Sequence, residues 1–523
     1  MADNGVDRRR FLGAAAAAGA GVAGLAALTG CDTASADHNA AAGSPAAPSG
    51  SVSAVGGTPT ALQIEQARPG NADWQAGPTG PQEAVEGYAD KVSVLPGESF
   101  ALHVSTTAPG FTVSAYRMGW YGGAKARRVW RSDRIAGHQQ APSTLSGSTR
   151  TVRANWTPTV SVSTEGWPEG AYLLRLDAEN GFHRYVPMIV RSTDVAGKTV
   201  LAHGAATWQA YNVRGGYSLY QGQNGSYGTR SLSVSFDRPY DGTGADLFLV
   251  YERAVVELTE RLGIPLAYTT GLEIHRQPGA LHGATTLLSL GHDEYWTPQQ
   301  RTAVTRLRDA GTNIAFLGAN TCFRRIRIED DARTVVCYKT DFEDDPLYGK
   351  DDALVTTDFR AEPRPDPESS LTGVLYEGYP TDAPYVVHAA DHWLYAGTGV
   401  KNGESFPHLV GVEYDRVTPD QPTPRPIEIL AHSPLVCEGR DSHSDTAYYT
   451  VPSGAGVFAS GTMRWVEGLM AGTHEDWGDH GMDARTGAFV TRATENLITS
   501  FAEGPAGRNL PAPRDNVASV YYA

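Results

Sequence analysis

Cysteine is scarce in this chain, which has only four cysteines among 523 residues. Three of these cysteines, Cys322, Cys337 and Cys437, lie in the body of the chain. Because three is an odd number they cannot all pair with one another, and no CxxC or CxxH pattern links them. A disulfide framework and a structural zinc site of the usual spacing are therefore not expected. We predict that these three residues are small, buried and apolar in character.

The chain also has fewer positively than negatively charged residues and lacks the usual phosphate-binding motif. Lys and Arg number 43 against 58 Asp and Glu, and the resulting net charge of −15 disfavours nucleic acid as a partner. No Gly-rich loop ends in GK[ST], and Ser289 before Gly291 does not form a GxSxG elbow. Nucleotide binding and serine hydrolysis therefore lose support.

The apolar run near the N terminus, residues 13–28, is too short and too weakly hydrophobic to favour a permanent membrane span. It follows the basic sequence RRRFL at 8–12 and precedes LTGC at 28–31, which resembles the lipobox of bacterial lipoproteins. Residues 1–30 thus read as a twin-arginine signal peptide. We predict export of the folded chain and lipid attachment at Cys31, which gives a cell-surface lipoprotein; a plain cleaved secretory signal is the alternative.

Changes in composition indicate a tether at residues 31–59 and a β domain at 60–195. The tether is rich in Ala, Gly, Ser and Pro and has few large apolar residues, so it cannot bury enough surface to fold. In the β domain, period-two alternation between Gly- and Pro-rich turns predicts an antiparallel, immunoglobulin-like sandwich. The expected strands are 91–95, 99–105, 111–118, 159–163, 171–177 and 183–190.

Residues 196–505 follow a longer rhythm, in which apolar runs alternate with helix-length stretches. This rhythm predicts an α/β domain with a mostly parallel sheet, followed by a C-terminal tail at 506–523. The expected strands are 199–203, 265–269, 285–290, 313–317, 408–413, 428–432 and 456–460, and the expected helices are 246–262, 298–310 and 487–501.

A polar segment follows the strand expected at 285–290. Gly291 allows a tight turn at the end of this strand. His292 and Glu294 are therefore expected in a loop at the carboxyl edge of the sheet, where open α/β sheets bind ligands. In extended backbone their spacing directs both side chains to one side and Asp293 to the other. The pair suits a metal ligand with its partner or a general base with its orienter; a capped turn without chemistry is the alternative.

Two further segments end at the same edge. Residues 205–220 follow the first strand of the α/β domain and contain Tyr211, which either packs in the loop or turns its phenol toward the site. Residues 318–325 follow another strand and contain Asn320, which either caps a turn or donates its amide to a carbonyl group. Convergence of three strand-end loops favours a site over either alternative.

Several longer motifs resemble those of the large (beta) subunit of N,N-dimethylformamidase. The resemblance covers nearly the whole mature chain in the same order, and the motifs are rich in Trp and Tyr. The extra N-terminal lectin-like region and the small subunit of the characterised enzyme have no counterpart here. The motifs are YRMGWYGG (116–123), WQAYN (208–212), SFDRPY (235–240), GHDEYW (291–296), GANTC (318–322) and CYK (337–339).

The resemblance implies a β-sandwich followed by a domain like the class I glutamine amidotransferases. It also implies one mononuclear iron, Fe(III), held by Tyr172, Tyr211 and Glu294. His292, Asn320 and Lys339 would line the site. Hard anionic oxygen donors suit Fe(III), which acts as a Lewis acid toward an amide carbonyl.

Glu413 is a candidate for a further acid or base, with a surface strand carboxylate as the alternative. The implied activity is hydrolysis of a C–N bond in a small N-substituted amide such as a formamide. Another amide or a cell-envelope component is an alternative substrate, because fold and ligand set do not determine a substrate. A cell-surface binding protein with a catalytically silent α/β domain is the competing function. The sequence leaves a homo-oligomer open.

Overall fold

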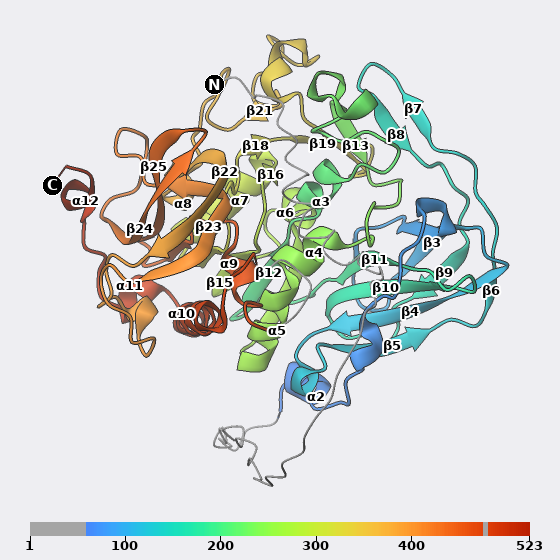
Figure 1. Cartoon of the computed structure of the whole chain (residues 1–523), viewed down its shortest axis with the longest axis horizontal. Coiled ribbons are helices and arrows are strands. Elements are labelled where there is room, and N and C mark those ends of the chain that lie inside the picture. Colours follow the sequence, from blue (N-terminus) through green and yellow to red (C-terminus); the bar gives the residue numbers. More distant parts are fainter. Residues whose placement is uncertain (1–58, 474–479, 523) are drawn as a thin grey trace, which may run out of the picture.

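The computed structural model describes residues 59–473 and 480–522 (Figure 1). The predicted signal peptide, Cys31 and nearly all of the tether lie outside the described residues. The first described helix, α2 (Ala61–Gln66), begins at Thr60, whose side chain accepts a hydrogen bond from the backbone of Gln63 while the Gln63 side chain accepts one from the backbone of Thr60. This reciprocal capping box is a standard start for a short helix.

A β-sandwich follows, as the alternating pattern predicts. Its smaller sheet has the order β1 (Val85–Ala89), β3 (Ser99–Thr106) and β9 (Val160–Ser163). Its larger sheet has the order β2 (Ser93–Val94), β11 (His183–Val190), β10 (Gly170–Ala178), β4 (Gly110–Met118) and β5 (Ala126–Arg131), and β6 (Ile135–Ala136) pairs with β4. All six expected strands are present, so the β-rich N-terminal part is confirmed, while its immunoglobulin-like character stays a prediction.

The larger sheet of the sandwich is buried on both faces. Along β10, Tyr172, Leu174 and Leu176 pack in the core between the two sandwich sheets. Ala171 and Leu173, which point the other way, belong to the main core that extends into the rest of the molecule. Period-two alternation therefore divides one strand between two cores.

The second part of the chain is built on a seven-stranded sheet. Its order is β14 (Leu266–Thr270), β12 (Thr199–His203), β15 (Thr286–Ser289), β17 (Asn313–Phe316), β26 (Gly456–Ala459), β25 (Arg440–Thr450) and β24 (Ile427–Cys437). The first five strands are parallel, and β25 and β24 extend one side of the sheet as antiparallel strands. The mostly parallel sheet is confirmed; the likeness to a glutamine amidotransferase domain stays a prediction.

The three expected helices are observed as α4, α5, α7 and α10, and the other helices of this part were not expected. One expected helix, 246–262, is divided at Glu252 into α4 and α5, because Glu252 leaves helical geometry. Its side chain instead accepts hydrogen bonds from Gly204 and Trp208. The helices are α3 (Ala205–Tyr211), α4 (Asp246–Tyr251), α5 (Arg253–Leu262), α6 (Gly271–Arg276), α7 (Pro298–Asp309), α8 (Ser369–Thr372), α9 (Trp465–Gly468), α10 (Ala484–Ala502), α11 (Ala506–Asn509) and α12 (Val517–Tyr521).

Smaller sheets complete the fold. A long antiparallel pair joins β22 (Leu375–Val386) to β23 (Ser405–Arg416), and the sequence pattern indicated only part of β23. The remaining strands are β7 (Thr144–Ser146), β8 (Thr151–Arg153), β13 (Ser233–Ser235), β16 (Tyr295–Trp296), β18 (Arg324–Arg325), β19 (Arg327–Glu329), β20 (Thr334–Val336) and β21 (Thr357–Asp358).

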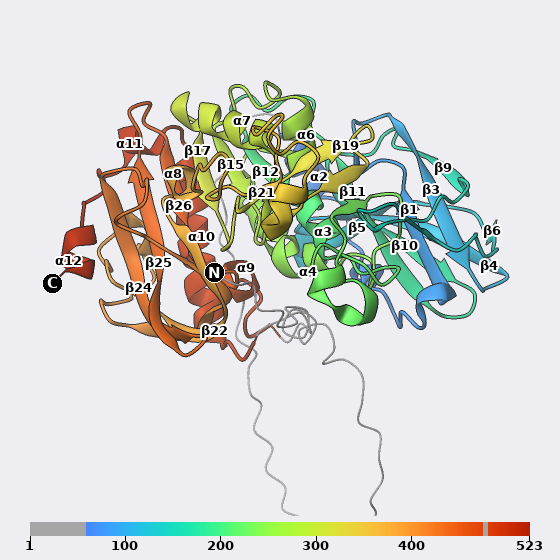
Figure 2. The same ribbon diagram turned by 90° about the horizontal axis from the view of Figure 1, so that it is seen from above.

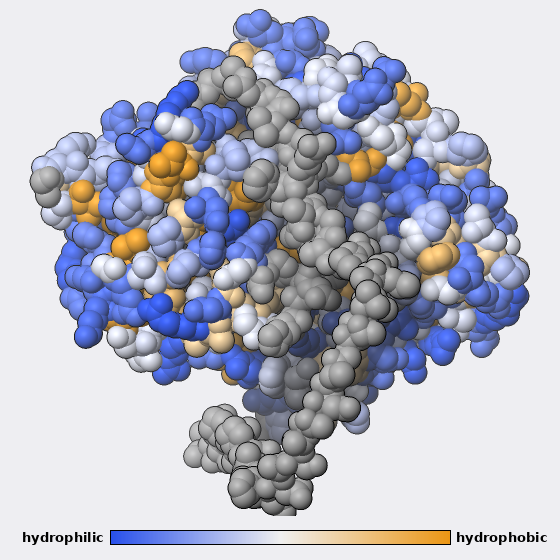
Figure 3. Space-filling model, in the orientation of Figure 1, coloured by the Kyte–Doolittle hydropathy of each residue, from blue (hydrophilic) through white to orange (hydrophobic). Residues whose placement is uncertain are grey.

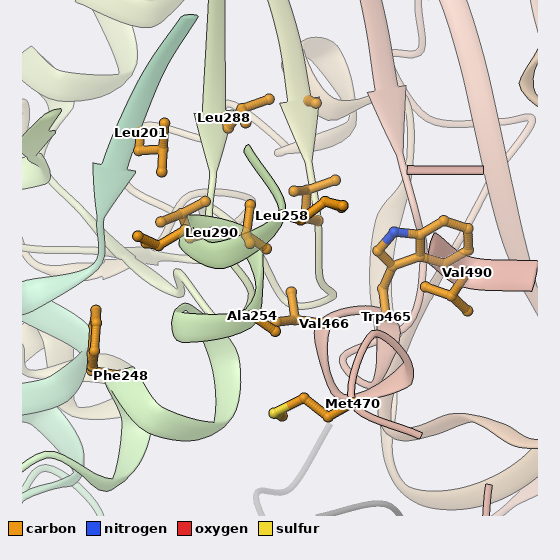
Figure 4. Packing of buried hydrophobic residues seen from close by; sticks show 14 of the residues in the cluster. Leu201, Phe248, Ala254, Leu258, Leu288, Leu290, Trp465, Val466, Met470 and Val490 are labelled. Carbon is orange, nitrogen blue, oxygen red and sulfur yellow. The ribbon is translucent and has the colours of Figure 1, made fainter. Parts of the chain in front are cut away.

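Figure 2 shows the sandwich at one end of the molecule, the C-terminal strands at the other, and the strands β12, β15 and β17 between them. In the close view of Figure 4, Ala254 and Leu258 of α5 lie between Leu288 and Leu290 of the sheet region and Val466 of α9. Arg117 of the sandwich and Glu260 of α5 form a buried ion pair at 2.5 Å, which ties the two parts together.

The face in Figure 3 is mostly hydrophilic, with apolar residues in small scattered groups. Among residues 59–473 and 480–522, no helix combines the length and the apolar character that a membrane crossing needs. Cys322, Cys337 and Cys437 are buried free thiols, which confirms the prediction made for them.

Candidate functional site

Three loops meet at the carboxyl edge of the neighbouring strands β12, β15 and β17, as the sequence predicts. Two glycines allow the loops to approach closely. A Cβ on Gly318 would lie 1.9 Å from the carbonyl oxygen of Gly291, and one on Gly291 would lie 2.3 Å from the carbonyl oxygen of Tyr251. Gly291 also has a φ of +48°, which glycine adopts at low cost. The loops after β15 and β17 can therefore touch through their backbones.

Two phenols and one carboxylate converge in this space. The hydroxyl oxygen of Tyr211 lies 2.8 Å from Oε2 of Glu294, and that of Tyr220 lies 2.7 Å from Oε1 and 2.6 Å from Oε2 of Glu294. The two hydroxyl oxygens are 3.0 Å apart. All three residues are buried. We call Tyr211, Tyr220 and Glu294 the tyrosine–glutamate cluster.

His292 lies against this cluster from the same loop as Glu294. Its Nε2 is 2.9 Å from the hydroxyl oxygen of Tyr211 and 3.5 Å from Oε2 of Glu294. Burial by itself lowers the pKa of His292, but Glu294 and the charge of Glu413 raise it, and the net pKa is above the usual value. Asp293 points away and accepts a hydrogen bond from Ser289 at 3.1 Å, as the spacing predicts.

Two buried cations, Lys339 and Arg324, also contact the cluster. Nζ of Lys339 lies 3.3 Å from the ring centroid of Tyr220. This cation–π contact stabilises negative charge on the phenol. Nε of Arg324 lies 3.2 Å from Oε1 of Glu294, and Arg324 also pairs with Asp358. Lys339 is fully buried and has a φ of +57°, which is rare for a side-chain-bearing residue outside functional positions.

Asn320 and Glu413 form a second polar group beside His292. Nδ2 of Asn320 donates to Oε2 of Glu413 at 2.7 Å, and the Asn320 backbone N–H donates to Asp415 at 2.7 Å. Asn320 has a φ of +57° and is fully buried. Glu413 is also buried, on β23, so the alternative of a surface carboxylate is wrong. Burial raises the pKa of Asp415 to about 8.

The match to known families covers most of this region. Residues 112–479 match the family described as N,N-dimethylformamidase beta subunit-like, C-terminal. The chain belongs to this family. The name of the N,N-dimethylformamidase beta subunit-like family points to a hydrolase of the dimethylformamidase kind. The matched range contains every residue of the tyrosine–glutamate cluster.

No curated protein matches the sequence significantly. Among solved structures, one similarity is to the crystal structure of a Paenibacillus sp. cycloisomaltooligosaccharide glucanotransferase complexed with cycloisomaltoheptaose. It has 11% sequence identity and a TM-score of 0.15, and it covers 49% of this chain and 33% of that chain. At that TM-score the likeness carries no structural argument.

Tyr172, the second tyrosine expected for this family's site, lies elsewhere. Its ring stacks on Trp167 at 5.1 Å between centroids in the sandwich core, and its hydroxyl donates to the carbonyl oxygen of Pro168 at 2.5 Å. The expectation that Tyr172 joins Tyr211 and Glu294 is therefore corrected. Alternation along β10 directs Tyr172 into the core between the sandwich sheets, away from the α/β part.

Tyr220 takes the place beside Tyr211 that was expected for Tyr172, and sequence reasoning missed it. Arg238, fully buried, holds the connecting loop by donating to the carbonyl oxygens of Asn212 at 2.9 Å, Arg214 at 3.0 Å and Tyr217 at 2.8 Å. The only sequence signals were the position of Tyr220 nine residues after Tyr211 and the buried-type arginine in the SFDRPY motif.

The donor set of the cluster fits a small hard cation. Oxygen ligands at about 2.0 Å from such a cation, at right angles to each other, stand about 2.8 Å apart. The oxygen separations in the cluster run from 2.6 to 3.0 Å. Within the described residues, no group of three His, Cys, Asp or Glu is placed to hold a metal ion, so an ion at this cluster would need the two phenols as ligands beside Glu294. Phenolate and carboxylate oxygens suit Fe(III).

Proposed function

We propose that the chain is an iron-dependent hydrolase that cleaves the C–N bond of a small N-substituted amide. The observation that carries the proposal is the convergence of Tyr211, Tyr220 and Glu294 on one buried point, at distances that suit ligands of one ion. Membership of the N,N-dimethylformamidase beta subunit-like family supports the reaction class.

Tyr211, Tyr220 and Glu294 would hold the Fe(III) ion. When bound, the ion supplies Lewis-acid chemistry that polarises an amide carbonyl and makes water more acidic. Two phenolates and a carboxylate balance its charge. Lys339, over the ring of Tyr220, and Arg324, beside Glu294, lower the cost of keeping these donors anionic in a buried place.

The neighbouring side chains have separate roles. His292, which contacts the hydroxyl of Tyr211, would pass a proton to the departing amine. Asn320, held by Glu413 and Asp415, would donate its remaining amide hydrogen to the oxygen that gains charge as the carbonyl carbon becomes tetrahedral.

The net reaction consumes one water molecule. The water oxygen forms a bond with the carbonyl carbon, the C–N bond breaks, and its electron pair stays on nitrogen. The nitrogen takes up a proton that originates from the water. The products are a carboxylic acid and an amine.

The deciding experiment compares wild type with Glu294→Gln, which keeps the size of the side chain and removes its charge. We expect wild type to contain iron, to show a visible tyrosinate-to-iron absorption band and to release dimethylamine from N,N-dimethylformamide. Glu294→Gln should lose the band and at least about a hundredfold in kcat/KM. Glu329→Gln, an exposed carboxylate on β19, is the matched control.

An iron-free, colourless wild type whose amide hydrolysis survives Glu294→Gln would contradict the proposal. Metal content is measured by elemental analysis and activity by amine release. We further propose that the chain is exported through the twin-arginine route and anchored at Cys31, because a site built from several distant segments can be loaded only after folding. Mass spectrometry of the mature N terminus tests the lipid.

A further inference from the structure

Helix α3 contributes to both sides of the tyrosine–glutamate cluster. Its last residue is Tyr211, one of the two phenols. Four residues earlier, Oγ1 of Thr207 accepts hydrogen bonds from the backbone N–H of Glu294 at 3.1 Å and from that of Tyr295 at 3.3 Å. The position of α3 therefore determines how the phenol of Tyr211 and the carboxylate of Glu294 meet.

The start of α3 is held by a residue from another helix. Gly204 precedes α3, and a Cβ there would lie 3.1 Å from Oδ1 of Asp293, which leaves little room for a capping side chain. The carboxylate of Glu252 instead accepts from the backbone N–H of Gly204 at 3.1 Å and from the indole N–H of Trp208 at 2.7 Å. Nδ1 of His203 lies 2.5 Å from the same carboxylate. An ionised carboxylate only accepts hydrogen bonds, so this nitrogen donates as well.

Glu252 reaches this place because the helical path is interrupted at its position. It separates α4 from α5, with a φ of −131° and a ψ of −39°. Only 1% of its surface is exposed. A carboxylate in such a place is costly unless hydrogen bonds satisfy it, and its three donors all come from the end of β12 and the start of α3. The interruption thus brings a buried acceptor to the segment that leads to Tyr211.

We propose that Glu252 is a positioning residue for Tyr211. Its carboxylate holds the start of α3, and the helix transmits this placement to the phenol about 10 Å further along, since each residue rises about 1.5 Å. Trp208, which Glu252 holds directly, lies three residues before Tyr211 and so faces the same side of the helix. Hydrogen bonds to an ionised acceptor are about twice as strong as neutral ones, so the charge of Glu252 is needed. The consequence for iron binding and hydrolysis rests on the proposed function.

The test compares Glu252→Gln, which keeps the size of the side chain and removes its charge, with Glu260→Gln. Glu260 of α5 is the matched control because it is also a buried carboxylate, 2% exposed, but its partners are Arg117 of the sandwich and Tyr268 of β14. The readout is the fluorine NMR spectrum of the metal-free full chain labelled with fluorotyrosine, in which Tyr211→Phe identifies the Tyr211 signal. We expect Glu252→Gln to move this signal beyond its wild-type line width and Glu260→Gln to leave it in place.

The iron-loaded protein gives a second readout. Glu252→Gln should shift the tyrosinate-to-iron band and lower kcat by at least about tenfold, because a misplacement of about 1 Å can cost about a hundredfold in rate. Glu260→Gln should keep the wild-type band and kcat, although both variants lower the urea midpoint of unfolding. A Tyr211 signal that stays in place in Glu252→Gln, or that moves equally in both variants, would overturn the positioning role.

His203 provides a further test if Glu252→Gln does not fold. His203→Leu removes one donor to Glu252, whereas His203→Asn keeps an N–H group near the position of Nδ1. We expect the leucine variant to move the Tyr211 signal and the asparagine variant to restore it. A Tyr211 signal that His203→Leu leaves unchanged would contradict the proposal.

The NMR signal also separates this inference from the proposed function. A wild type without iron and without amide hydrolysis would overturn the proposed function, while a Tyr211 signal that moves in Glu252→Gln and not in Glu260→Gln would still support the positioning role. A wild type with iron and hydrolysis, whose Tyr211 signal is the same in all three proteins, would keep the proposed function and overturn the role of Glu252.

Discussion

Tyr172 in the sandwich and Tyr211 at the edge of the seven-stranded sheet are both buried tyrosines, but their hydroxyls meet different surroundings. The hydroxyl of Tyr172 donates to one backbone carbonyl oxygen among apolar neighbours. The hydroxyl of Tyr211 meets a second phenol, a carboxylate and an imidazole. Burial of a polar group with one partner is ordinary core packing, whereas several ionisable groups on one point indicate a site.

The same contrast holds for buried carboxylates. In the sandwich, Asp177 pairs with Arg175 and His183, and although burial opposes them these partners lower its pKa. At the sheet edge, burial raises the pKa of Asp415 to about 8. The sandwich therefore stabilises its charges by pairing, and the sheet edge tolerates groups that are costly to ionise. Buried groups that are costly to ionise are retained mainly at functional sites.

The largest expected effect directly tests whether buried tyrosines in the two regions differ in function. Tyr220→Phe removes one of the two phenols from the cluster and should weaken and shift the tyrosinate-to-iron band, with a loss of at least about a hundredfold in kcat/KM. Tyr172→Phe removes only the hydrogen bond to Pro168, so activity and the band should persist while stability falls by about 1 kcal/mol. Absorption spectra, amine release and urea unfolding provide the measurements.

A Tyr172→Phe variant without iron, beside a Tyr220→Phe variant with normal iron content, would reverse the assignment. The phenylalanine substitutions are matched, since each removes one oxygen from a buried tyrosine. The difference between the two variants therefore reports on the surroundings of each hydroxyl.

A second, smaller effect concerns the loop that carries Tyr220. Arg238→Ala leaves several buried carbonyl oxygens without their donor, and we expect a loss of about 3 kcal/mol in the free energy of unfolding together with weaker iron retention. Arg134→Ala on the sandwich surface removes an exposed pair with Glu179 and should change neither property. Unchanged iron retention in a folded Arg238→Ala protein would show that Arg238 does not position Tyr220 for iron binding.

A further effect is a pH dependence of stability. Because the pKa of Asp415 is raised in the folded chain, native protein keeps a proton that unfolded protein has released. The stability from this proton is full below about pH 4 and is lost as pH rises to about 8. Asp415→Asn keeps an oxygen acceptor for Asn320 and should flatten the fall of Tm between about pH 5 and pH 8.

Asp177→Asn is the contrasting variant, because the lowered pKa of Asp177 adds stability above the acid range. It should lower Tm at every pH in that window without changing the slope. Equal slopes for wild type and Asp415→Asn would show that Asp415 ionises normally.

Much of the fold could be predicted because local patterns determine it. Alternation predicted the six sandwich strands, and the helix expected at 298–310 is observed as α7, which Thr297 caps. The convergence of His292 and Glu294 followed from their spacing in extended backbone. Alternation along β10 also predicts that Tyr172 shares its face with Leu174 and Leu176. The assignment of Tyr172 to the site by motif position did not take this alternation into account.

Other features depended on contacts between distant segments. The division of the helix at Glu252 follows from hydrogen bonds to Gly204 and Trp208. The two long strands β22 and β25 lie in loop-like sequence and form only because their partners supply hydrogen bonds. Sequence windows contain no record of such partners.

By itself the sequence determined the order of the elements, the strand ends that carry polar residues, and the family to which the chain belongs. Only the tertiary structure decided which tyrosine stands beside Tyr211. The loop between Tyr211 and Tyr220 has no periodicity that directs a side chain, and its path depends on Arg238, which comes from a later segment. Periodicity determines direction within an element, whereas convergence between loops depends on long-range packing and buried hydrogen bonds.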